Sequence, residues 1–206
     1  VMWDPNGTNA ANTLLFRRVP PSFNYGTRGL PLIANVYNDI TTGSKTNDYP
    51  EAIIINSVSG SAGIVTAYNL NFNTTAGTTT QHIWSLATND MSGCTGITAF
   101  DFDGNGIREI VYRDQSTLRI INGNRNTPVN YATADVASST WGEYPIVADL
   151  NNDGQAEIAV TGNNMLQVFG SDPVTFPWRA APNYWNQRNY RIVNINSNLT
   201  IPTTEI

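Results

Sequence analysis

The sequence is poor in charged residues, and above all in lysine. Of its 206 residues 13% are charged and Lys45 is the only lysine, whereas Asn occurs 27 times and Thr 24 times. Charged residues usually make up about a quarter of a soluble domain and cover the exposed faces of its helices. The composition therefore excludes long surface helices and coiled coils. The net charge of −5 and the scattered arginines also exclude the clustered basic surface that nucleic acids and anionic membranes require.

Cysteine and histidine occur once each, as Cys94 and His82. A single cysteine excludes an internal disulfide and thiolate metal sites, which need several sulfurs. A single histidine excludes multi-histidine zinc or iron centres and leaves any Ser-His-Asp triad dependent on His82. No apolar run approaches the roughly 18–20 residues that cross a bilayer as a helix. We therefore expect no nucleic-acid partner and no direct insertion into a membrane.

An internal repeat organises the chain. Residues 101–109 (DFDGNGIRE) align without a gap with residues 149–157 (DLNNDGQAE). The match continues downstream at the same offset of 48, where residues 118–121 (LRII) align with residues 166–169 (LQVF). A match of this length indicates a repeated structural unit and not an isolated motif.

A degraded copy precedes these two. Residues 34–39 (ANVYND) resemble residues 148–153 (ADLNND), and Glu51 takes the place of Glu157. Ten extra residues, 40–49, interrupt the loop of this first copy. We therefore expect three units of the same kind, of which the first is altered.

Within each copy the pattern is a short β-branched run, a loop rich in Gly, Asn and Asp, a second short run, a turn and a third run. Short apolar runs with this spacing are typical of β-strands. Residues 64–68 (IVTAY) are expected to be the third strand of the first copy, and outer fourth strands are expected to begin at Ile83-Trp84 and at Pro177-Trp178. Four short antiparallel strands in about 48 residues have the size of a propeller blade. The sequence thus predicts an all-β fold, namely a β-propeller or a partial propeller.

The loop of the second copy places oxygen-bearing side chains at every other residue. Asp101, Asp103 and Asn105 take positions 1, 3 and 5, while Gly106 takes position 6 and Glu109 position 9. Side chains two residues apart on a tightly curled backbone converge on one point, and Ca²⁺ takes six to eight oxygen ligands. Glycine at position 6 permits the positive φ that such a turn requires. The pattern predicts a calcium-binding loop.

The third copy repeats this loop. Its matching residues are Asp149, Asn151, Asp153, Gly154 and Glu157. At position 7, Ile107 or Gln155 would offer a backbone carbonyl. An EF-hand is excluded, because it requires flanking helices and a bidentate Glu at position 12, where this chain has Tyr112 or Val160. The remaining alternative is a metal-free turn, since Asp, Asn and Gly favour turns on their own.

The two loops resemble those of FG-GAP or VCBS repeats, the calcium-binding blades of integrin α-subunit propellers and of many bacterial surface proteins. The resemblance covers about residues 30–178. It implies a β-propeller whose calcium loops lie at one rim and stiffen a scaffold for adhesion or ligand recognition. It also implies two ligand sets: Asp101, Asp103, Asn105, the carbonyl of Ile107 and Glu109 for one ion, and Asp149, Asn151, Asp153, the carbonyl of Gln155 and Glu157 for the other.

Two further segments can be compared with this family, namely the loop of the first copy and the end of the chain. The first copy has Asn35 and Tyr37 where two ligands belong, so we expect it to bind no ion, or one held partly by Asp39 and Asp48. Near the end of the chain, the segments WNQRNYRIVNIN and LTIP resemble, more faintly, stretches that follow such repeats in very large secreted bacterial surface and gliding-motility proteins. The resemblance of these tail segments adds to that of the two loops and favours a bacterial surface origin.

The predicted organisation is a single propeller-type domain, or a fragment of one, over residues 1–206. Three units do not close a ring of six to eight blades, which needs roughly 300 residues or more. In order, the expected parts are an N-terminal strap or partial blade (1–29), a degenerate blade (30–90), two calcium blades (91–140 and 141–178) and a C-terminal strap or partial blade (179–206).

The leading functional hypothesis is a non-enzymatic, calcium-stabilised adhesion or interaction module of a secreted or cell-surface protein. Its expected partner is a surface protein, a glycan or the remainder of a larger polypeptide. A structural role of calcium is favoured, because no open coordination site with a partner base is visible in the sequence. The alternatives are a carbohydrate-binding or polysaccharide-acting accessory domain, and a structural subunit of a surface filament.

The carbohydrate alternative depends on aromatic rings and on carboxylates outside the metal loops. The aromatic candidates, for which burial in the core is the more common role, are Trp178, Tyr184, Trp185 and Tyr190. The carboxylate candidates, among which no spacing singles out a catalytic pair, are Asp4, Asp90, Asp114, Asp135, Glu143 and Asp172. Of the remaining reactive residues, His82 is expected in a strand and Cys94 as a buried or inert thiol.

Overall fold

The computed structural model describes residues 29–38, 50–58, 62–69, 82–124, 127–139, 141–185 and 200. In these ranges every regular element is a β-strand, and all strand pairs are antiparallel. None of them contains a helix with the length and hydrophobicity to cross a membrane. The predicted all-β class is therefore confirmed.

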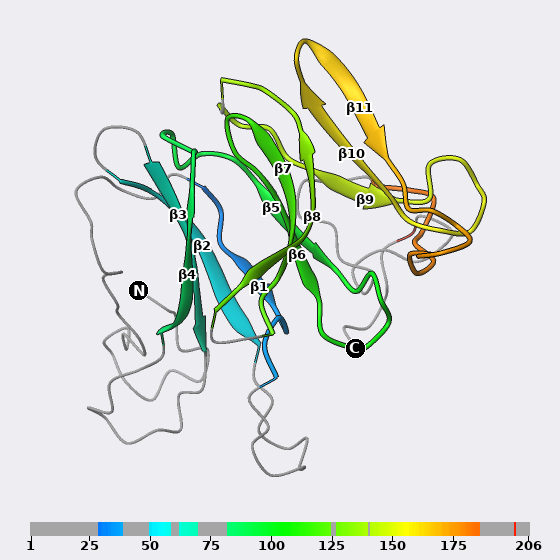
Figure 1. Ribbon diagram of the computed structural model, residues 1–206, viewed down its shortest axis with the longest axis horizontal. Helices are drawn as coiled ribbons and strands as arrows, with labels where there is room; N and C mark the ends of the chain where they lie inside the picture. Colours follow the sequence, from blue (N-terminus) through cyan, green and yellow to red (C-terminus); the bar gives the residue numbers. More distant parts are fainter. Residues whose placement is uncertain are drawn as a thin grey trace.

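Three sheets lie side by side (Figure 1). The first sheet has the order β1-β2-β3-β4, the second β5-β6-β7-β8 and the third β11-β10-β9. The strands are β1 (Leu32–Ala34), β2 (Glu51–Val58), β3 (Ala62–Asn69), β4 (His82–Thr88), β5 (Ile97–Phe100), β6 (Glu109–Arg113), β7 (Thr117–Asn122), β8 (Val129–Asp135), β9 (Ile146–Ala148), β10 (Glu157–Gly162) and β11 (Met165–Phe169). Each sheet is thus one meander of consecutive strands.

The strand register confirms the internal repeat, including its degraded copy. Glu51, Glu109 and Glu157 each begin the second strand of a sheet, opposite the last residue of the first strand. The third strand of the first copy is β3, and a fourth strand, β4, begins beside Ile83-Trp84 as predicted. The first sheet therefore has the complete four-stranded pattern despite its altered loop.

The third sheet differs from the prediction, because no strand begins at Pro177-Trp178. Proline lacks the N–H that a strand ladder uses, and this stretch contains both Pro177 and Pro182. Residues 176–183, which we call the crossing segment, run instead past the loops of the second and third sheets. The Arg179 N–H donates to the Phe102 carbonyl at 3.0 Å, and the Arg179 carbonyl accepts from Ala156 N–H at 3.0 Å. The expected fourth strand is therefore replaced by a bridge between loops.

Two hydrophobic cores fill the spaces between the sheets. One packs residues such as Ile53, Val65 and Trp84 of the first sheet against Ile110 and Tyr112 of the second. Because side chains alternate across a strand, Val111 and its neighbours point to the other face of β6 and form the second core with the third sheet. All five residues of β6 are buried in consequence. The middle sheet therefore depends on both of its neighbours.

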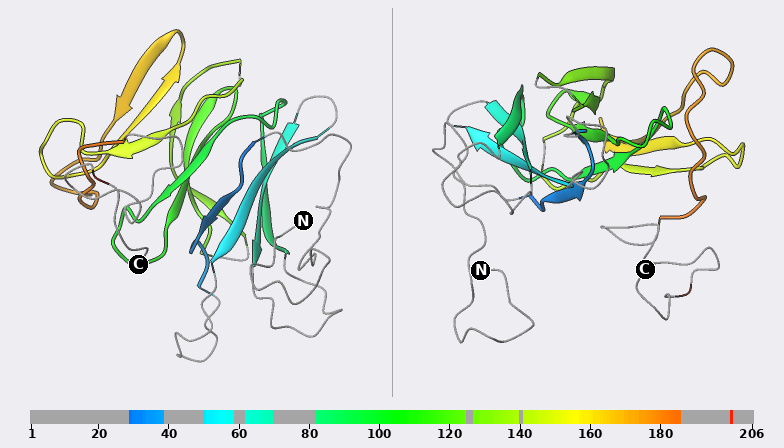
Figure 2. Two further views of the ribbon diagram at one scale, coloured as in Figure 1. Left: turned by 180° about the vertical axis from the view of Figure 1, so that it is seen from behind. Right: turned by 90° about the horizontal axis from the view of Figure 1, so that it is seen from below.

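The first strands of the three sheets lie next to one another. β1 contacts β5, and β5 contacts β9, while the later strands of each sheet point away from this line (Figure 2). Blades of a propeller are arranged in this way around their axis. The three described sheets do not close a ring, so closure and the predicted division into straps and blades stay predictions. Of the tail motifs, residues 185–196 and 199–202, all but Trp185 and Thr200 lie outside the described residues.

Candidate metal centre

The loop of the second sheet, residues 101–108, curls around the side chain of its first residue. Asp101 Oδ1 accepts the backbone N–H groups of Gly104 and Asn105 at 2.8 and 3.0 Å, and Oδ2 accepts that of Gly106 at 2.9 Å. The turn requires left-handed backbone at Gly104 (φ 76°) and Gly106 (φ 90°). The carboxylate of Asp101 thus fixes the curvature of the loop that carries Asp103 and leads to Glu109.

The loop of the third sheet, residues 149–156, has the same backbone conformation. Its left-handed residues are Asn152 (φ 61°) and Gly154 (φ 88°), which match Gly104 and Gly106 in the alignment. Asp149 Oδ2 accepts the N–H of Gly154 at 3.0 Å, as Asp101 does from Gly106. Left-handed conformation is uncommon outside glycine, so its recurrence at Asn152 shows that the geometry is specified and not incidental.

The three equivalent glutamates share one structural task. Glu51, Glu109 and Glu157 are all buried, and in each case Oε2 accepts the backbone N–H two residues after the first strand ends. These N–H groups belong to Val36 at 2.9 Å, Phe102 at 3.0 Å and Leu150 at 2.7 Å. Sequence reasoning assigned Glu109 and Glu157 only as metal ligands and missed this role. The sequence did contain a signal for this role, because the first copy keeps the equivalent glutamate, Glu51, although it lacks a complete ligand set.

In the second sheet's loop, three carboxylates converge. Oxygens of Asp101, Asp103 and Glu109 lie within 4.8 Å of one another. Burial raises the pKa of Glu109 to about 7; the hydrogen bond from Phe102 N–H opposes this rise, and the negative charges of Asp103 and Asp101 add to it. A cation placed among these oxygens would favour the ionised form of Glu109. The cluster is therefore able to hold a metal ion.

The third sheet's loop offers a different observation. Asp149 is 9% exposed and its Oδ1 has no hydrogen-bond partner in the described part of the chain. Nearby, Asn151 Nδ2 donates to Asp153 Oδ2 at 3.0 Å and to Glu157 Oε1 at 3.2 Å, so these two carboxylate oxygens have a hydrogen-bond partner and Asp149 Oδ1 has none. Buried carboxylate oxygens are rarely left without a partner. The donor set therefore fits a cation that would complete the contacts of Asp149.

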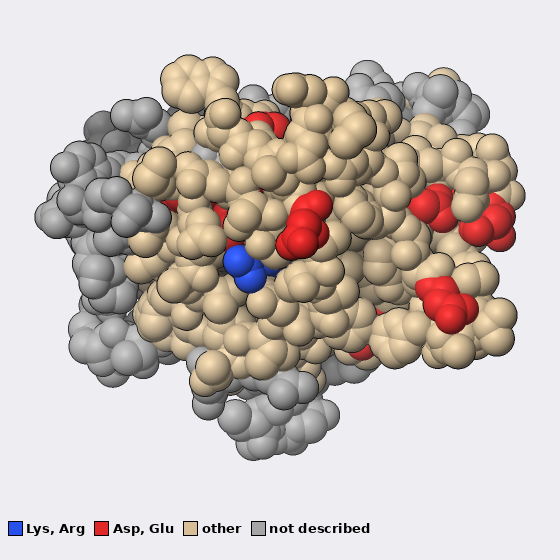
Figure 3. All heavy atoms as spheres, turned by 45° about the horizontal axis from the view of Figure 1, so that its top comes forward, with Lys and Arg blue, Asp and Glu red and all other residues tan. Residues whose placement is uncertain are grey.

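The two loops contain only oxygen ligands among their predicted residues. The N–H group of Ile107 donates to Asn105 Oδ1 at 2.7 Å, and that of Gln155 donates to Asp153 Oδ1 at 2.8 Å. These bonds use the N–H groups of Ile107 and Gln155 and do not involve their carbonyl oxygens, which are the predicted ligands. The surface shown in Figure 3 carries many more acidic than basic side chains. Oxygen-only donors and an acidic surface suit a hard cation such as Ca²⁺ better than a soft metal.

The degraded first loop is hydrogen-bonded to residues of the second sheet and its loop. The carbonyl of Asn35 accepts Arg108 N–H at 2.9 Å, so this loop is tied to the loop of the second sheet. Asn38 N–H donates to Asn124 Oδ1 at 2.8 Å. Asp39 and Asp48, the expected partial ligands, lie outside the described residues, so their binding of an ion stays a prediction.

Two of the aromatic candidates, Trp178 and Trp185, belong to the core, and Tyr184 is half-buried. Trp178 is 9% exposed and packs edge-on against Phe102, with ring centroids 4.6 Å apart. Trp185 packs partly buried against the same core. Tyr190 lies outside the described residues. Two exposed aromatic side chains that the sequence did not single out are Trp141, at 79%, and Phe176, at 52%.

Most of the carboxylates considered for catalysis hold internal hydrogen bonds. Asp90 caps the turn 90–95, Asp114 pairs with Arg119 at 2.9 Å, and Asp172 caps the turn 172–176. Glu143 forms an ion pair with Arg113 at 3.1 Å. Asp135 lies in β8, and Asp4 is outside the described residues. As predicted, His82 lies in a strand, and Cys94 lies in a loop, where its Sγ donates to the Ser92 carbonyl.

Comparisons with known proteins agree with this geometry. Residues 101–160 match a family described as FG-GAP-like repeat. The crystal structure of the V. cholerae biofilm matrix protein Bap1 is similar over 76% of this chain, with a TM-score of 0.61 and 29% sequence identity. The match spans 25% of that protein's chain, and no curated protein matches the sequence. Residues 101–160 of this protein are thus an FG-GAP-like repeat.

Proposed function

We propose that this chain is a non-enzymatic interaction module of a secreted or cell-surface protein, in which two Ca²⁺ ions stabilise the loops of the second and third sheets. The proposed ligands of the first ion are Asp101, Asp103, Asn105, the carbonyl of Ile107 and Glu109. Those of the second ion are Asp149, Asn151, Asp153, the carbonyl of Gln155 and Glu157. Each set has the oxygen chemistry of a calcium loop.

The buried Oδ1 of Asp149 is the observation that carries the proposal. A metal-free turn explains why Asp and Asn occur in these loops, but it does not explain a buried carboxylate oxygen without a partner. A bound cation supplies the missing contact. In the other loop it would also relieve the repulsion among Asp101, Asp103 and Glu109.

The extracellular location rests on the family match and on the chemistry of the sites. FG-GAP-like repeats and a solved neighbour titled as a biofilm matrix protein both favour a surface or matrix environment. Extracellular calcium modules bind at about 10⁻⁴ to 10⁻³ M, which would fill the sites outside cells and leave them empty in cytosol. The partner is then another matrix or surface component, either a protein or a glycan.

Ion stoichiometry tests the ligand assignment. Equilibrium dialysis against calcium, followed by elemental analysis, should give two ions for the unmodified chain and one fewer for each of Asp101→Ala and Asp149→Ala. Asn35→Ala, in the degraded loop, serves as the matched control and should leave the number unchanged. Two ions in either aspartate variant, with the fold intact by circular dichroism, would contradict the assignment.

A further inference from the structure

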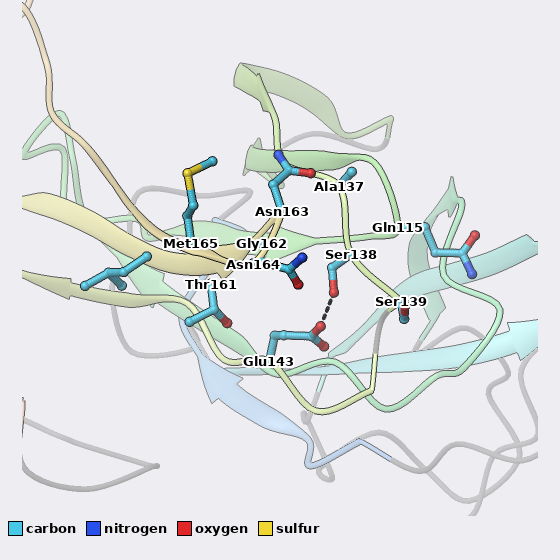
Figure 4. A pocket seen from close by; sticks show the side chains of 11 residues that line it. Gln115, Ala137, Ser138, Ser139, Glu143, Thr161, Gly162, Asn163, Asn164 and Met165 are labelled. Atoms are coloured by element: carbon cyan, nitrogen blue, oxygen red, sulfur yellow. Dashed lines mark hydrogen bonds between the residues drawn. The ribbon is translucent and has the colours of Figure 1, made fainter.

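A pocket opens between the second and third sheets, at the ends of the strands away from the candidate metal loops. It has a volume of about 800 Å³ and is lined by the β6–β7 turn, the connection from β8 to β9 and the β10–β11 turn (Figure 4). Because the strands are antiparallel, these turns lie at the opposite end from the loops that follow β5 and β9. The pocket is thus separate from the candidate calcium sites.

One wall of the pocket is held in place by Glu143. Its Oε1 accepts Ser138 Oγ–H and pairs with the guanidinium of Arg113, while Oε2 accepts the N–H groups of Trp141 and Gly142 at 2.7 and 2.9 Å. Arg113 is completely buried beneath it. Both carboxylate oxygens are therefore occupied by internal donors, and the pocket wall presents no uncompensated charge.

The opposite wall is the tight turn between β10 and β11. Asn163 and Asn164 both have left-handed backbone, with φ of 53° and 60°, which is the geometry of a type I′ hairpin turn. The N–H of Asn163 donates to the Ala137 carbonyl at 2.7 Å and fixes the turn against the first wall. This hydrogen bond joins the two walls of the pocket directly.

Three primary amides line this pocket without internal partners. The side chains of Gln115, Asn163 and Asn164 make no hydrogen bond within the described part of the chain. Thr161 contributes a hydroxyl that likewise makes no hydrogen bond within the described part of the chain. Amides and hydroxyls both donate and accept hydrogen bonds, so together they match a ligand whose groups do both. Hydroxyl groups of a sugar have this property, whereas phosphate and carboxylate ligands only accept.

Apolar side chains lie beside these polar groups. Met165 and Leu166 line the pocket and are 58% and 69% exposed. Trp141, 79% exposed, belongs to the turn whose N–H groups hold Glu143. Trp141 is two residues from the lining residues Ser139 and Glu143, and an exposed aromatic ring provides a surface for the C–H face of a sugar ring. No unpaired Lys, Arg, Asp or Glu lines the pocket, so an acidic or basic ligand has no counter-charge there.

We infer that this pocket binds a neutral saccharide, as a short stretch of a polysaccharide chain. The amides of Gln115, Asn163 and Asn164 hydrogen-bond its hydroxyls, and Trp141, two residues before the lining residue Glu143, stacks on a ring of the saccharide that extends beyond the lining residues. The inference specifies the partner within the proposed interaction function and rests on that function. A volume of about 800 Å³ accommodates more than one sugar ring.

The inference can be tested by titrating the calcium-loaded chain with neutral oligosaccharides. Binding is measured by isothermal titration calorimetry and by tryptophan fluorescence. Binding of at least one neutral oligosaccharide is expected. Asn164→Gly removes the amide but tolerates the left-handed turn, and it should weaken binding about five- to tenfold, as should Gln115→Ala. Trp141→Ala should weaken binding and abolish the fluorescence change. Asn130→Ala, an exposed amide on β8 outside the pocket, is the matched control and should bind normally.

The outcomes separate the pocket from the calcium sites. If the chain binds two calcium ions but no neutral saccharide, the pocket inference is wrong and the proposed function stands. Binding only of acidic saccharides or of peptides would also overturn it, as would unchanged affinity in Asn164→Gly and Gln115→Ala. If calcium binding fails while a neutral saccharide binds with the expected variant pattern, the pocket inference holds and the calcium proposal is wrong.

Discussion

Glu51, Glu109 and Glu157 are the same residue in three repeats, but only the last two stand beside a complete set of oxygen ligands. The shared contact is the hydrogen bond from the backbone N–H at the start of the loop. This bond exists whether or not the loop has the other ligands. The glutamate therefore closes the loop first, and its second oxygen is available for a cation only where the loop provides the remaining ligands.

Glu51→Gln separates these two roles. Glu51 is completely buried and accepts N–H groups from Val36 and Tyr37, at 2.9 and 3.1 Å. The amide keeps one acceptor oxygen but loses the charge, so we expect a loss of about 1–2 kcal/mol in the free energy of unfolding. Urea unfolding in excess calcium measures it, with ion stoichiometry unchanged at two. Loss of an ion in this variant would mean that the first repeat also binds calcium.

Glu143→Gln tests the ion pair between the buried Arg113 and the partly buried Glu143. Burial raises the pKa of Glu143, but hydrogen bonds from Ser138 and from the backbone of Gly142 and Trp141 outweigh it and lower the value to about 2. Because this pKa lies below the ordinary value near 4.5, the stability from Glu143 is present above pH 4.5 and lost as the pH falls towards 2. At pH 7 the variant should lose about 3–5 kcal/mol, since Arg113 stays buried without its partner.

A double variant gives the control for this prediction. Arg113→Met combined with Glu143→Gln removes both charges, and it should be more stable than Glu143→Gln alone. Stability of the unmodified chain should fall between pH 4.5 and 2, and the double variant should lose less over that range. A single Glu143→Gln variant as stable as the unmodified chain would contradict the coupling.

At this scale the sequence was informative about the loops and silent about the ion pair. Spacing two residues apart is visible in DFDGNGIRE and DLNNDGQAE, because the ligands of one loop are local in sequence. Arg113 and Glu143 are 30 residues apart (143 − 113) and on different elements, and nothing in their neighbourhood signals that they meet. Contacts of this kind follow from how sheets are placed, which one-dimensional spacing does not encode.

Among the elements, the crossing segment has the largest consequence for the candidate sites. It accepts from Asp149 N–H and Ala156 N–H in the third sheet's loop and donates to the Phe102 carbonyl in the second sheet's loop. Trp178 also packs on Phe102, and Asn183 Nδ2 donates to Asn152 Oδ1 at 3.1 Å. One segment of chain therefore contacts both loops. An ion that orders one loop should favour order in the other.

Trp178→Ala tests this coupling. The ring is 9% exposed within the second core, so its loss should lower the free energy of unfolding by about 3–5 kcal/mol. Calcium affinity should fall at both loops, because both rely on the same segment. Val174→Ala, at an 86% exposed position just before the segment, is the control and should change neither quantity. Weakening of one site alone in Trp178→Ala, measured by calorimetry, would show that the loops are independent.

The sequence predicted the strands well where the repeat was intact and failed where prolines interrupted it. β4 began near Ile83-Trp84 because β-branched and aromatic residues continue the pattern there. The expected strand at Pro177-Trp178 had the right offset from β8, but Pro177 and Pro182 remove ladder donors. The route that the chain takes instead is held by tertiary contacts, namely the packing of Trp178 on Phe102 and the backbone hydrogen bonds of Arg179 and Pro182.

For the whole molecule, the two cores make the middle sheet dependent on both neighbours. Ile110 and Tyr112 face the first sheet, whereas Val111 and Ile120 face the third. Removing either neighbour would expose one face of β6, which is buried along its whole length. The described sheets should therefore unfold together. Ring closure could not be predicted from sequence, because it depends on contacts between blades far apart in the chain.

A thermal melt in calcium and in EDTA tests whether the loops bind calcium and whether the described sheets unfold together. At 10 mM calcium and a Kd of about 10⁻⁴ to 10⁻³ M, each site should add about 1.4–2.7 kcal/mol by mass action, or about 3–5 kcal/mol for two. For a chain of this size that corresponds to a rise in Tm of roughly 5–15 °C over EDTA. Magnesium should give a smaller rise, since it demands a tighter octahedral site and keeps its waters.

The shape of the same transition reports on the cores. A single cooperative transition that moves as a whole with calcium is expected, because both loops flank the second core and the middle sheet shares both cores. Two separate transitions, of which only one shifts, would mean that the first sheet folds independently of the calcium loops. Equal Tm values in calcium and EDTA for a folded chain would mean that the loops are metal-free turns, and the unpartnered Oδ1 of Asp149 would then need another ligand.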